Sequence, residues 1–496
     1  MICVSIARGR HRHMIAEHRH LVQQGARLVE LRLDYINGEV NLRRLLVDRP
    51  SPVVITCRRP PDGGKWTGTE EQRLMLLRSA IAEGVDYVDM EEDVAAMIPR
   101  YGKTKRIVSL HDFRKTPDNL PEIHARLMAL DADIVKIATT ANNTHDNLRM
   151  LQLMRNAKVP TVAICMGDIG TPSRILAGRF GAPFTFATFH HERTLAPGQL
   201  SFQQMTEIYH YDRIDADTAV FGVIGDPIAH SLSPMVHNAA FRRLDVNAVY
   251  VPFRVPREHL AQFLEDAPAL GIQGLSVTIP HKEAVLKRLA KKDATVAGIG
   301  AVNTVIFDPD GAMTGYNTDY QAGLDSLEQA LDDVRGRHES LEGQTALVLG
   351  AGGAAKALGF GLKQLGVHVV IAGRTGQRAQ QLADTLKCRT VDWQNRYGVQ
   401  ADLLVNCTPV GMHPNVDATP YDKHHLRPSM IVFDTVYNPE NTLLIKEAYS
   451  QSCTVVTGVD MFVRQACLQF KLFTGQEAPR DLMRDVLRRA IGPAKY

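Results

Sequence analysis

The sequence lacks the features by which membrane proteins and secreted proteins are recognised. No apolar run approaches the ~18 residues that a transmembrane helix needs, and Met1 leads directly into a short strand-like run, ICVSI, rather than into a signal peptide. The seven cysteines form no C-x-x-C pair, which favours reduced thiols over a disulfide framework. We therefore predict a cytoplasmic protein.

An excess of charge of one sign is also missing. Lys plus Arg number 57 and Asp plus Glu number 54, a difference of +3, so the chain provides no strong field for nucleic acid or for a membrane surface. Internal repeats and low-complexity segments are absent as well. We expect partners that are small-molecule substrates, and the chain to be a monomer or a homodimer.

Strand-like and helix-length segments alternate in the N-terminal part of the chain. The strand-like runs are ICVSI, RLVELRL, PVVITC, DYVDM, RIVSL, DIVKIA, TVAICM and FTFATF. Eight strands in this alternation are typical of a (β/α)8 TIM barrel, whose catalytic residues lie at the C-terminal ends of the strands. We expect a last helix from Ser201 to about His210 and place the end of the barrel at residue 218, before the new strand-like run AVFGVIG.

A lysine occurs where a barrel strand should be apolar. Lys136 lies in ADIVKIATT, in which alternate side chains face the barrel interior, and Lys is rarely buried without a function. A neutral amine in such a site can attack a ketone to form an imine. The preceding strand ends in RIVSLHDF and brings His111 to the same rim, where it could transfer an α-proton. An eliminase or aldolase site and a rim lysine beside a structural histidine both fit this spacing.

Several motifs that occur in one order make the N-terminal part specific. They are ELRLD, TCRRPPDGG, SLHDFRKTP, ADIVKIA, TPSRILAGRFG and APGQ. By these motifs, residues 1 to about 213 resemble a type I 3-dehydroquinate dehydratase. The resemblance implies an imine between Lys136 and the substrate's C3 ketone, with His111 as the general acid and base that yields 3-dehydroshikimate. It also implies these substrate-binding residues: Ser5, Glu30, Arg32, Arg58, Asp62, Arg174, Phe186 and Gln199.

Two positions depart from that family's usual pattern. Asp62 replaces the common Glu before the paired glycines, and we expect its shorter carboxylate still to orient His111. Leu195 replaces a Ser or Thr before APGQ, which removes a hydroxyl from the substrate loop unless Thr194 supplies one. We expect activity with altered affinity. For the implied substrate-binding arginines, Arg32, Arg58 and Arg174, the alternative interpretation is that they form salt bridges at the rim of the barrel.

A dinucleotide-binding signature dominates the C-terminal half. TALVLGAGGAA, from Thr345 to Ala355, joins a strand-like run, a glycine turn and a helix start. In such a unit, glycines allow the tight turn and the approach of a pyrophosphate to a helix N-terminus. An acidic residue about 20 residues downstream would favour NAD, whereas an Arg favours the 2′-phosphate of NADP. The following strand-like run ends in GRT, so Arg374 and Arg378 predict NADP(H).

Motifs of a second family extend from about Ala219 to the C-terminus. They are GVIGDPIAHSLSP, GLSVTIPHKE, GIGAVNTV, GYNTDYQAG, GAGGAA, NCTPVGM and GVDMFVRQA. This part resembles a shikimate dehydrogenase, which implies Lys282 and Asp319 as the catalytic pair beside the carbonyl that receives hydride. The implied substrate-binding residues are Ser231, Ser233, Thr278, Asn303, Tyr437 and Gln465. The implied cofactor-binding residues are Gly350, Gly352, Gly353, Ala354, Ala355, Arg374, Thr375, Arg378, Thr408 and Gly458.

Two positions depart from the dehydrogenase pattern. Ser276 replaces the usual Asn, and its shorter side chain leaves either a gap or room for a water. The sequence therefore leaves open whether the site discriminates between shikimate and quinate. Gly373 replaces the Asn of the usual NRT and lacks a side chain that would contact the ribose. We expect a preference for NADP over NAD, and the sequence leaves open how strong that preference is.

We therefore predict a bifunctional chain in three parts. Residues 1–218 form the dehydratase barrel, residues 219–330 the α/β substrate domain completed by residues 460–496, and residues 331–459 a Rossmann domain. The expected reactions are dehydration of 3-dehydroquinate and then reduction of 3-dehydroshikimate to shikimate, two steps of aromatic amino acid biosynthesis. Two alternatives remain: a dehydrogenase that accepts quinate as well, and a ligand sensor with inactive sites.

The His-rich segment HRHMIAEHRH near the N-terminus invites a metal-site interpretation. On a helix, His11 and His18 share one face and His13 and His20 share another, so no face collects three ligands. The interleaved arginines would repel a cation. We predict no bound metal and a solvated basic helix on the outside of the barrel.

Overall fold

The computed structural model describes residues 1–335 and 340–492. Packing divides them into two compact units. The first comprises Met1–Val220, Pro227–Ala229 and Asn247–Gly271, and the second comprises the other residues from Phe221 onward. Residues 493–496, the end of the segment expected to complete the substrate domain, lie outside the described residues.

An eight-stranded parallel sheet forms the core of the first unit, in the order β7-β6-β5-β4-β3-β2-β1-β8. It is nearly closed, since no pairing joins β7 to β8 in this described stretch. The strands are β1 (Ile2–Ile6), β2 (Leu28–Arg32), β3 (Val53–Thr56), β4 (Tyr87–Glu91), β5 (Lys105–Asp112), β6 (Ile134–Thr140), β7 (Thr161–Met166) and β8 (Thr185–Thr188). Each lies within or overlaps one predicted run, and the predicted (β/α)8 barrel is confirmed.

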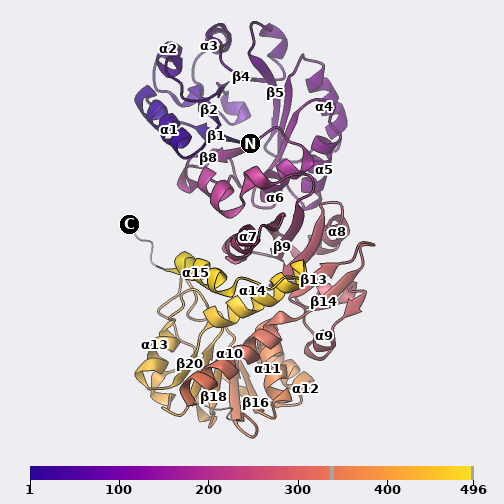
Figure 1. The fold of residues 1–496 in the computed structure, drawn as a ribbon, viewed down its shortest axis with the longest axis vertical. Helices are drawn as coiled ribbons and strands as arrows, with labels where there is room; N and C mark the ends of the chain where they lie inside the picture. The colour runs from indigo at the N-terminus through magenta and orange to yellow at the C-terminus, as the bar shows by residue number, and fades with distance from the viewer. Residues whose placement is uncertain (336–339, 493–496) are drawn as a thin grey trace. The chain divides into compact units, whose positions relative to one another are not determined.

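Helices follow most of these strands and lie around them, as Figure 1 shows. They are α1 (His11–Gln23), α2 (Leu42–Leu46), α3 (Glu70–Ala82), α4 (Leu120–Met128), α5 (His145–Arg155) and α6 (Thr171–Ile175). The expected last helix contains a π-helical turn, Gln204–Ile208. Among the described residues, no helix is both long and apolar enough to cross a membrane.

The predicted basic helix is α1, and it is not solvated on all sides. His18 is buried, and its Nε2 lies 2.8 Å from the hydroxyl of Ser51. His11 Nε2 accepts a hydrogen bond from the backbone N–H of Asn41 at 2.9 Å. His11 and His18, which share one face of the helix, therefore have structural partners, because this face packs against the barrel.

The interior of the barrel is layered along the strands. An apolar layer comes first and forms one buried cluster, which includes Leu28, Val54, Ile107, Ile134 and Phe184. Residues two positions apart on a strand face the same side. Leu28, Val54, Ile107 and Ile134 lie on β2, β3, β5 and β6. The residues two positions further along these four strands are polar: Glu30, Thr56, Ser109 and Lys136. The barrel thus has an apolar floor with a polar layer above it, toward the C-terminal ends.

The second sheet has six strands in the order β10-β9-β11-β13-β14-β12. Its strands are β9 (Ala219–Gly225), β10 (Ala248–Arg254), β11 (Ile272–Val277), β12 (Lys291–Lys292), β13 (Thr304–Phe307) and β14 (Met313–Tyr316). Its helices are α7 (Ser233–Arg243), α8 (Leu260–Asp266) and α9 (Ala294–Ile299). The predicted α/β substrate domain is confirmed as a fold; the boundaries that we assigned to it stay a prediction.

The third sheet is parallel throughout, in the order β17-β16-β15-β18-β19-β20. Numbered within this sheet, the order is that of a dinucleotide-binding fold, with its switch point between β15 and β18. The strands are β15 (Thr345–Leu349), β16 (His368–Gly373), β17 (Arg389–Asp392), β18 (Leu403–Asn406), β19 (Ile431–Asp434) and β20 (Thr454–Val456). The predicted Rossmann fold is confirmed.

Helices cover both faces of the third sheet. Alternate residues of β15 show this, since Val348 joins a core with α10, α11 and α12, whereas Leu347 joins a core with α13. The helices are α10 (Thr318–Arg335), α11 (Gly353–Gln364), α12 (Gly376–Leu386), α13 (Leu443–Ser450), α14 (Gly458–Thr474) and α15 (Arg480–Ile491). From this sheet the chain returns through α14, which packs against α7, β11 and β13, and α15, which packs against α7.

The apolar floor of the barrel generates a stability prediction. Phe184 is 1% exposed, and its ring centroid lies 5.5 Å from that of Phe186. We expect Phe184→Ala to lower the stability of the barrel by about 3–5 kcal/mol, because a large cavity would form in a closed interior. Denaturant unfolding followed by circular dichroism measures this loss. Val47→Ala, at a residue that is 75% exposed, is the control, and equal midpoints for the two variants would contradict the prediction.

Candidate active sites

A single cavity at the C-terminal ends of the barrel strands contains the residues predicted for the dehydratase. All ten predicted positions line it: Ser5, Glu30, Arg32, Arg58, Asp62, His111, Lys136, Arg174, Phe186 and Gln199. They come from many separate strands and loops, and the parallel barrel brings them together because all its strands end at the same rim.

Lys136 is buried, but its amine does not lie among apolar groups alone. Its Nζ donates a hydrogen bond to Asp89 Oδ2 at 2.7 Å and lies 4.1 Å from the centre of the Phe186 ring. Although burial by itself would raise the pKa of Asp89, the charges of Arg58 and Lys136 hold it well below its ordinary value. An ionised carboxylate therefore fixes the amine at the bottom of the cavity.

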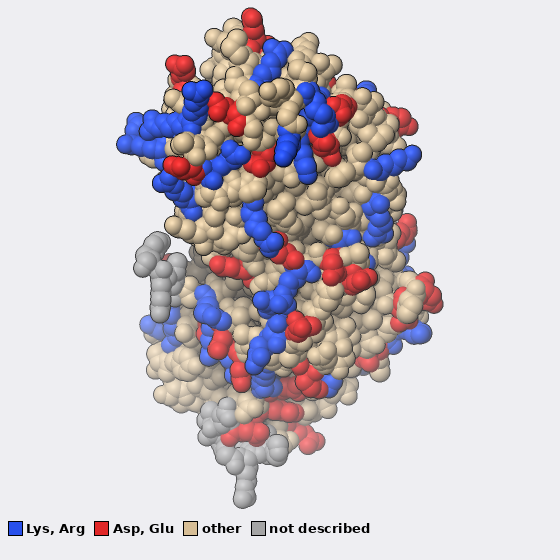
Figure 2. All heavy atoms as spheres, turned by 45° about the horizontal axis from the view of Figure 1, so that its top comes forward, with Lys and Arg blue, Asp and Glu red and all other residues tan. Residues whose placement is uncertain are grey.

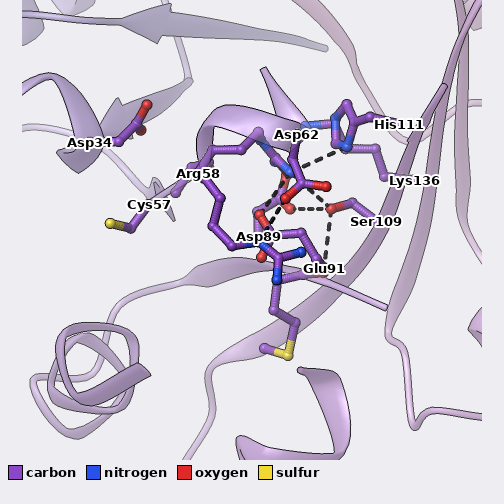
Figure 3. Close-up of polar contacts among 12 residues, drawn as sticks. Asp34, Cys57, Arg58, Asp62, Asp89, Glu91, Ser109, His111 and Lys136 are labelled. Atoms are coloured by element: carbon purple, nitrogen blue, oxygen red, sulfur yellow. Dashed lines mark hydrogen bonds and ion pairs between the residues drawn. The ribbon is translucent and has the colours of Figure 1, made fainter. Parts of the chain in front are cut away.

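Arg58 connects the charged groups of the polar layer. Its guanidinium lies 2.8 Å from Asp89 Oδ2, 3.2 Å from Glu91 Oε1 and 3.3 Å from Nδ1 of His111 (Figure 3). Ser109 completes the contacts by donating to Asp89 Oδ1 at 2.7 Å. Buried charges are tolerated when they are paired and hydrogen-bonded in this way.

His111 is held in its neutral form. Burial, followed by the charges of Arg58 and Lys136, lowers the pKa of His111 well below its ordinary value. A guanidinium can only donate, so the Nδ1 that faces Arg58 acts as an acceptor. The ring of Phe113 stacks on the imidazole with 6.2 Å between ring centroids. In this neutral tautomer Nε2 carries the proton, and the lone pair that could take an α-proton is on Nδ1, so removal of an α-proton by His111 requires Arg58 to release Nδ1.

The remaining polar groups of the cavity offer acceptors and donors for a polar substrate. Glu30 accepts hydrogen bonds from Ser5 at 2.5 Å and from Thr56 at 2.7 Å, and Arg32 forms a two-pronged ion pair with Asp34 at 2.9 and 2.8 Å. Arg174 differs from these, because its Nε is buried without a hydrogen-bond partner in the described part of the chain. Burial lowers the pKa of Arg174 to about 10, and an anionic group would supply the missing partner.

The two departures in the barrel have structural outcomes. Asp62 lines the cavity, but its carboxylate pairs with Arg59 at 2.7 Å, and the expected contact with His111 is not formed. Leu195 also lines the cavity, and its backbone N–H donates to Gln199 Oε1 at 2.9 Å. Thr194 is exposed and lies outside the cavity lining, so its hydroxyl does not replace the missing one.

The sequence analysis missed the acidic partners of the site. Asp89 and Glu91 lie two residues apart on β4 and so face the same side, and Glu91 also accepts from the fully buried Arg73 at 2.7 Å. The pattern D-M-E at the end of a barrel strand was the available signal. Carboxylates at alternate positions of such a strand must face either the barrel interior or the surrounding helices, and both locations require a cationic partner.

The predicted reductase pair is in contact. Lys282, after β11, donates from Nζ to Asp319 Oδ2 at 2.5 Å, and Asp319 lies in the first turn of α10. The aliphatic part of Lys282 runs directly beside α11, since a Cβ on Gly353 would lie 2.7 Å from Lys282 Cδ. The lysine is thus placed between the substrate domain and the start of the dinucleotide-binding helix.

Predicted substrate residues of this half differ in their contacts. Asn303 exchanges hydrogen bonds with Thr318, at 2.9 Å from Nδ2 and 2.8 Å to Oδ1, directly before Asp319. The backbone N–H of Ser233 approaches Ser231 Oγ at 3.4 Å. Other predicted residues contact neighbouring protein groups: the Thr278 backbone contacts Ile224 and His281, the Gln465 amide contacts the Phe462 carbonyl, and the Tyr437 ring lies 4.6 Å from that of Phe462 between centroids.

The hydroxyl of Ser276 has a partner within the protein. Its hydroxyl donates to Gln469 Oε1 at 2.8 Å, and the Gln469 amide donates to Thr304 Oγ1 at 3.0 Å. Gln469 comes from α14 and is 2% exposed. The sequence analysis missed this residue because the contact spans 193 positions.

The glycine turn after β15 fits a bound pyrophosphate. Gly350 has φ +111°, and a Cβ on it would lie 2.9 Å from the Cys407 carbonyl, so a side chain is excluded there. Gly352 is different, since nothing lies within 4 Å of its Cβ position. The helix α11 that follows has neither a side-chain cap nor an acidic residue in its first turn. The first N–H groups of α11 therefore have no side-chain cap among the described residues, and such groups suit an anion.

The basic residues after β16 are available to a ligand. Arg374 and Arg378 are exposed, and neither forms an ion pair with a carboxylate of the described residues. Gly373 is buried, and a Cβ there would lie 3.2 Å from the Ala379 Cβ. A side chain at position 373 would therefore need Ala379 of α12 to shift by a few tenths of an ångström. Two unpaired guanidinium groups fit a 2′-phosphate better than a 2′-hydroxyl.

Family models match both halves of the chain. Residues 2–216 match the type I 3-dehydroquinase family, and residues 223–305 match the shikimate dehydrogenase substrate binding domain. Residues 332–416 match the shikimate / quinate 5-dehydrogenase family, and residues 458–488 match the shikimate 5′-dehydrogenase C-terminal domain.

One relative spans both halves. The chloroplastic bifunctional 3-dehydroquinate dehydratase/shikimate dehydrogenase of Arabidopsis thaliana is 39% identical over 510 residues, which cover 99% of this chain and 84% of the relative. The chain belongs to this bifunctional family. As a bifunctional dehydratase/dehydrogenase, it has a lyase half and an oxidoreductase half of the shikimate pathway, as predicted.

Relatives of the oxidoreductase half alone are also similar. The shikimate dehydrogenase (NADP(+)) of Methanothermobacter thermautotrophicus is 42% identical over 56% of this chain and 99% of its own length. A solved shikimate dehydrogenase in complex with NADP+ is 36% identical over 56% of this chain, with a TM-score of 0.51. The solved enzyme of Aquifex aeolicus is 33% identical over 55% of this chain, also with a TM-score of 0.51.

The state of His111 generates a pH prediction for the bifunctional enzyme. Because its pKa is lowered, the imidazole stays neutral as pH falls; with His111 as the predicted base, the acid limb of kcat/KM for dehydration should lie below 6.5, the ordinary value for histidine. Initial rates of 3-dehydroshikimate formation across pH, with circular dichroism at each pH as the control for folding, measure this limb. An acid limb at or above pH 6.5 in folded protein would contradict the prediction.

Proposed function

We propose that the barrel dehydrates 3-dehydroquinate through an imine on Lys136 and that the second half reduces the product, 3-dehydroshikimate, to shikimate with NADPH. The observation that supports the first step best is the common cavity in which buried Lys136 lies with neutral His111. The substrate carries a carboxylate, and Arg174 offers a buried guanidinium nitrogen that has no hydrogen-bond partner among the described residues.

The first reaction divides between two side chains. The Lys136 amine, after giving up its proton, adds to the C3 ketone, and loss of water leaves the imine, which accepts electrons from the adjacent carbon. His111 removes the C2 proton and then delivers it to the departing C1 hydroxyl, which leaves as water. Hydrolysis of the imine releases 3-dehydroshikimate and returns Lys136. Asp89, at 2.7 Å, stabilises the cationic nitrogen at each stage in which it is charged.

The second reaction needs a proton donor beside a ketone. When bound, NADPH would supply the hydride, and the residues that would hold it are Gly350, Gly352, Gly353, Ala354, Ala355, Arg374, Thr375, Arg378, Thr408 and Gly458. Lys282 and Asp319, 2.5 Å apart, hold a proton between them where the alkoxide develops. Ser231, Ser233, Thr278, Asn303, Tyr437 and Gln465 would position the ring substituents.

The proposal extends to the organisation of the chain. We assign residues 1–218 to the dehydratase barrel, residues 219–330 to the substrate domain, which residues 460–496 complete, and residues 331–459 to the Rossmann domain. We also propose a cytoplasmic location.

One assay tests both activities together: purified protein supplied with 3-dehydroquinate and NADPH should oxidise NADPH without an added dehydratase. Failure to oxidise it with 3-dehydroshikimate supplied directly would refute the reductase step.

Trapping tests the imine. Borohydride added with 3-dehydroquinate should reduce the imine to a stable adduct on Lys136, located by mass spectrometry of the digested chain. Lys136→Ala should give no adduct and lose dehydration by several orders of magnitude, because the electron sink is lost. Reduction of 3-dehydroshikimate by the same variant is the control for folding. An active protein without an adduct would contradict the covalent step.

A pair of glycine variants tests the cofactor turn. Gly352→Ala adds a methyl group to open space on an extended backbone (φ −91°, ψ −170°), so folding should be unchanged. The methyl should nevertheless block the approach of the pyrophosphate and weaken NADP+ binding by about tenfold or more. Gly398→Ala, equally open and before β18, is the matched control. Calorimetric titration measures both, and equal affinities would contradict the proposed turn.

A further inference from the structure

A buried carboxylate that the proposed reactions do not use lies beside the cofactor turn. Asp434 is the last residue of β19 and is 0% exposed. Its strand pairs with β18, which pairs with β15, the strand that leads into the glycine turn. Asp434 is therefore at the C-terminal edge of the sheet, where ligands of this fold bind.

All the hydrogen-bond partners of Asp434 in the described residues are neutral donors. Oδ1 accepts from Asn406 Nδ2 at 2.9 Å and from the Val436 N–H at 3.0 Å, and Oδ2 accepts from the Thr442 hydroxyl at 2.6 Å. Burial raises the pKa of Asp434 to about 6, so the group is still ionised near neutral pH. A buried charge without a cation is costly, and its retention calls for a function.

The contact with Asn406 determines which way that amide points. A carboxylate can only accept, so the NH2 group of Asn406 must face Asp434, and its oxygen must face the other way. That oxygen accepts from the N–H of Thr408 at 2.9 Å and from its hydroxyl at 2.7 Å. Asp434 thereby fixes the segment 406–408, whose Cys407 carbonyl lies against Gly350.

A second segment is fixed from the same carboxylate. The Val436 N–H binds Asp434, and the Val436 carbonyl lies so close to Gly458 that a Cβ there would approach it to 2.2 Å. Gly458 begins α14. The loops that carry Thr408 and Gly458, both proposed to contact the cofactor, are therefore joined through one buried side chain.

We propose that Asp434 is a positioning residue of the NADP site, which acts by holding Asn406 and Val436 and through them the two loops that border the glycine turn. This inference rests on the proposed NADP site. Among the described residues, the hydrogen bonds of Asp434 go to Asn406, Val436 and Thr442 and not to the glycine turn, so its effect passes through these neighbours.

Three variants test this role. Asp434→Ala removes both acceptors, and the affinity for NADP+ should fall by about tenfold, since the Thr408 segment loses its anchor. Asp434→Asn keeps an oxygen for Asn406 and Val436 and should restore most of that affinity. Thr442→Val removes the hydroxyl that donates to Asp434 and that caps α13 by accepting from the Ile445 N–H, and it should lower thermal stability while leaving NADP+ affinity unchanged.

Calorimetric titration with NADP+ is the main measurement, and KM for NADPH against KM for 3-dehydroshikimate is the second. Dehydration by the barrel, which has its own compact unit, serves as an internal control for the intact chain. Unchanged NADP+ affinity in Asp434→Ala, or an equal loss in Thr442→Val, would overturn the positioning role. Absence of NADP+ binding by the unaltered protein would instead refute the proposed NADP site.

Discussion

The alternation of charges inside the barrel is the constraint on which its active site depends. Lys136 and Arg58 are buried above an apolar floor, and each is tolerated there only because Asp89 and Glu91 neutralise it. The same ion pairs locate the amine, the guanidinium and the imidazole relative to one another. Loss of Asp89 would leave Lys136 as a buried cation without its carboxylate partner, so the chemistry and the folding of this layer depend on the same ion pair.

The dehydrogenase half depends on close approach of backbone rather than on buried charge. Gly350, Gly353 and Gly458 each lie where a Cβ would meet another segment: Cys407, Lys282 and Val436, respectively. The glycines allow loops from different strands to converge at the switch point of the sheet. Asn406 accepts from Thr408, and Asp434 accepts from Asn406 and from Val436, which links these loops by hydrogen bonds.

Sequence patterns predicted the architecture well because hydrophobic periodicity reports on burial directly. The eight runs of the barrel and the TALVLGAGGAA unit each gave the correct strand. The patterns predicted less about the partners of the catalytic groups. Asp89 was overlooked because its role depends on contacts with Lys136 and Arg58, which come from other strands of the barrel. Gln469 was overlooked because it reaches Ser276 from a helix far along the chain. The expected role of Asp62 depended on loop geometry, and Arg59 takes its carboxylate instead.

The contact between Lys282 and Gly353 joins two functions that the sequence keeps apart. A side chain at position 353 would displace the stem of Lys282, so the start of the dinucleotide-binding helix determines where the reductase lysine can lie. The two positions cannot vary independently. A change of cofactor specificity by substitutions in α11 would therefore have to keep glycine at position 353, because Lys282 of the substrate domain occupies the space that a side chain would need.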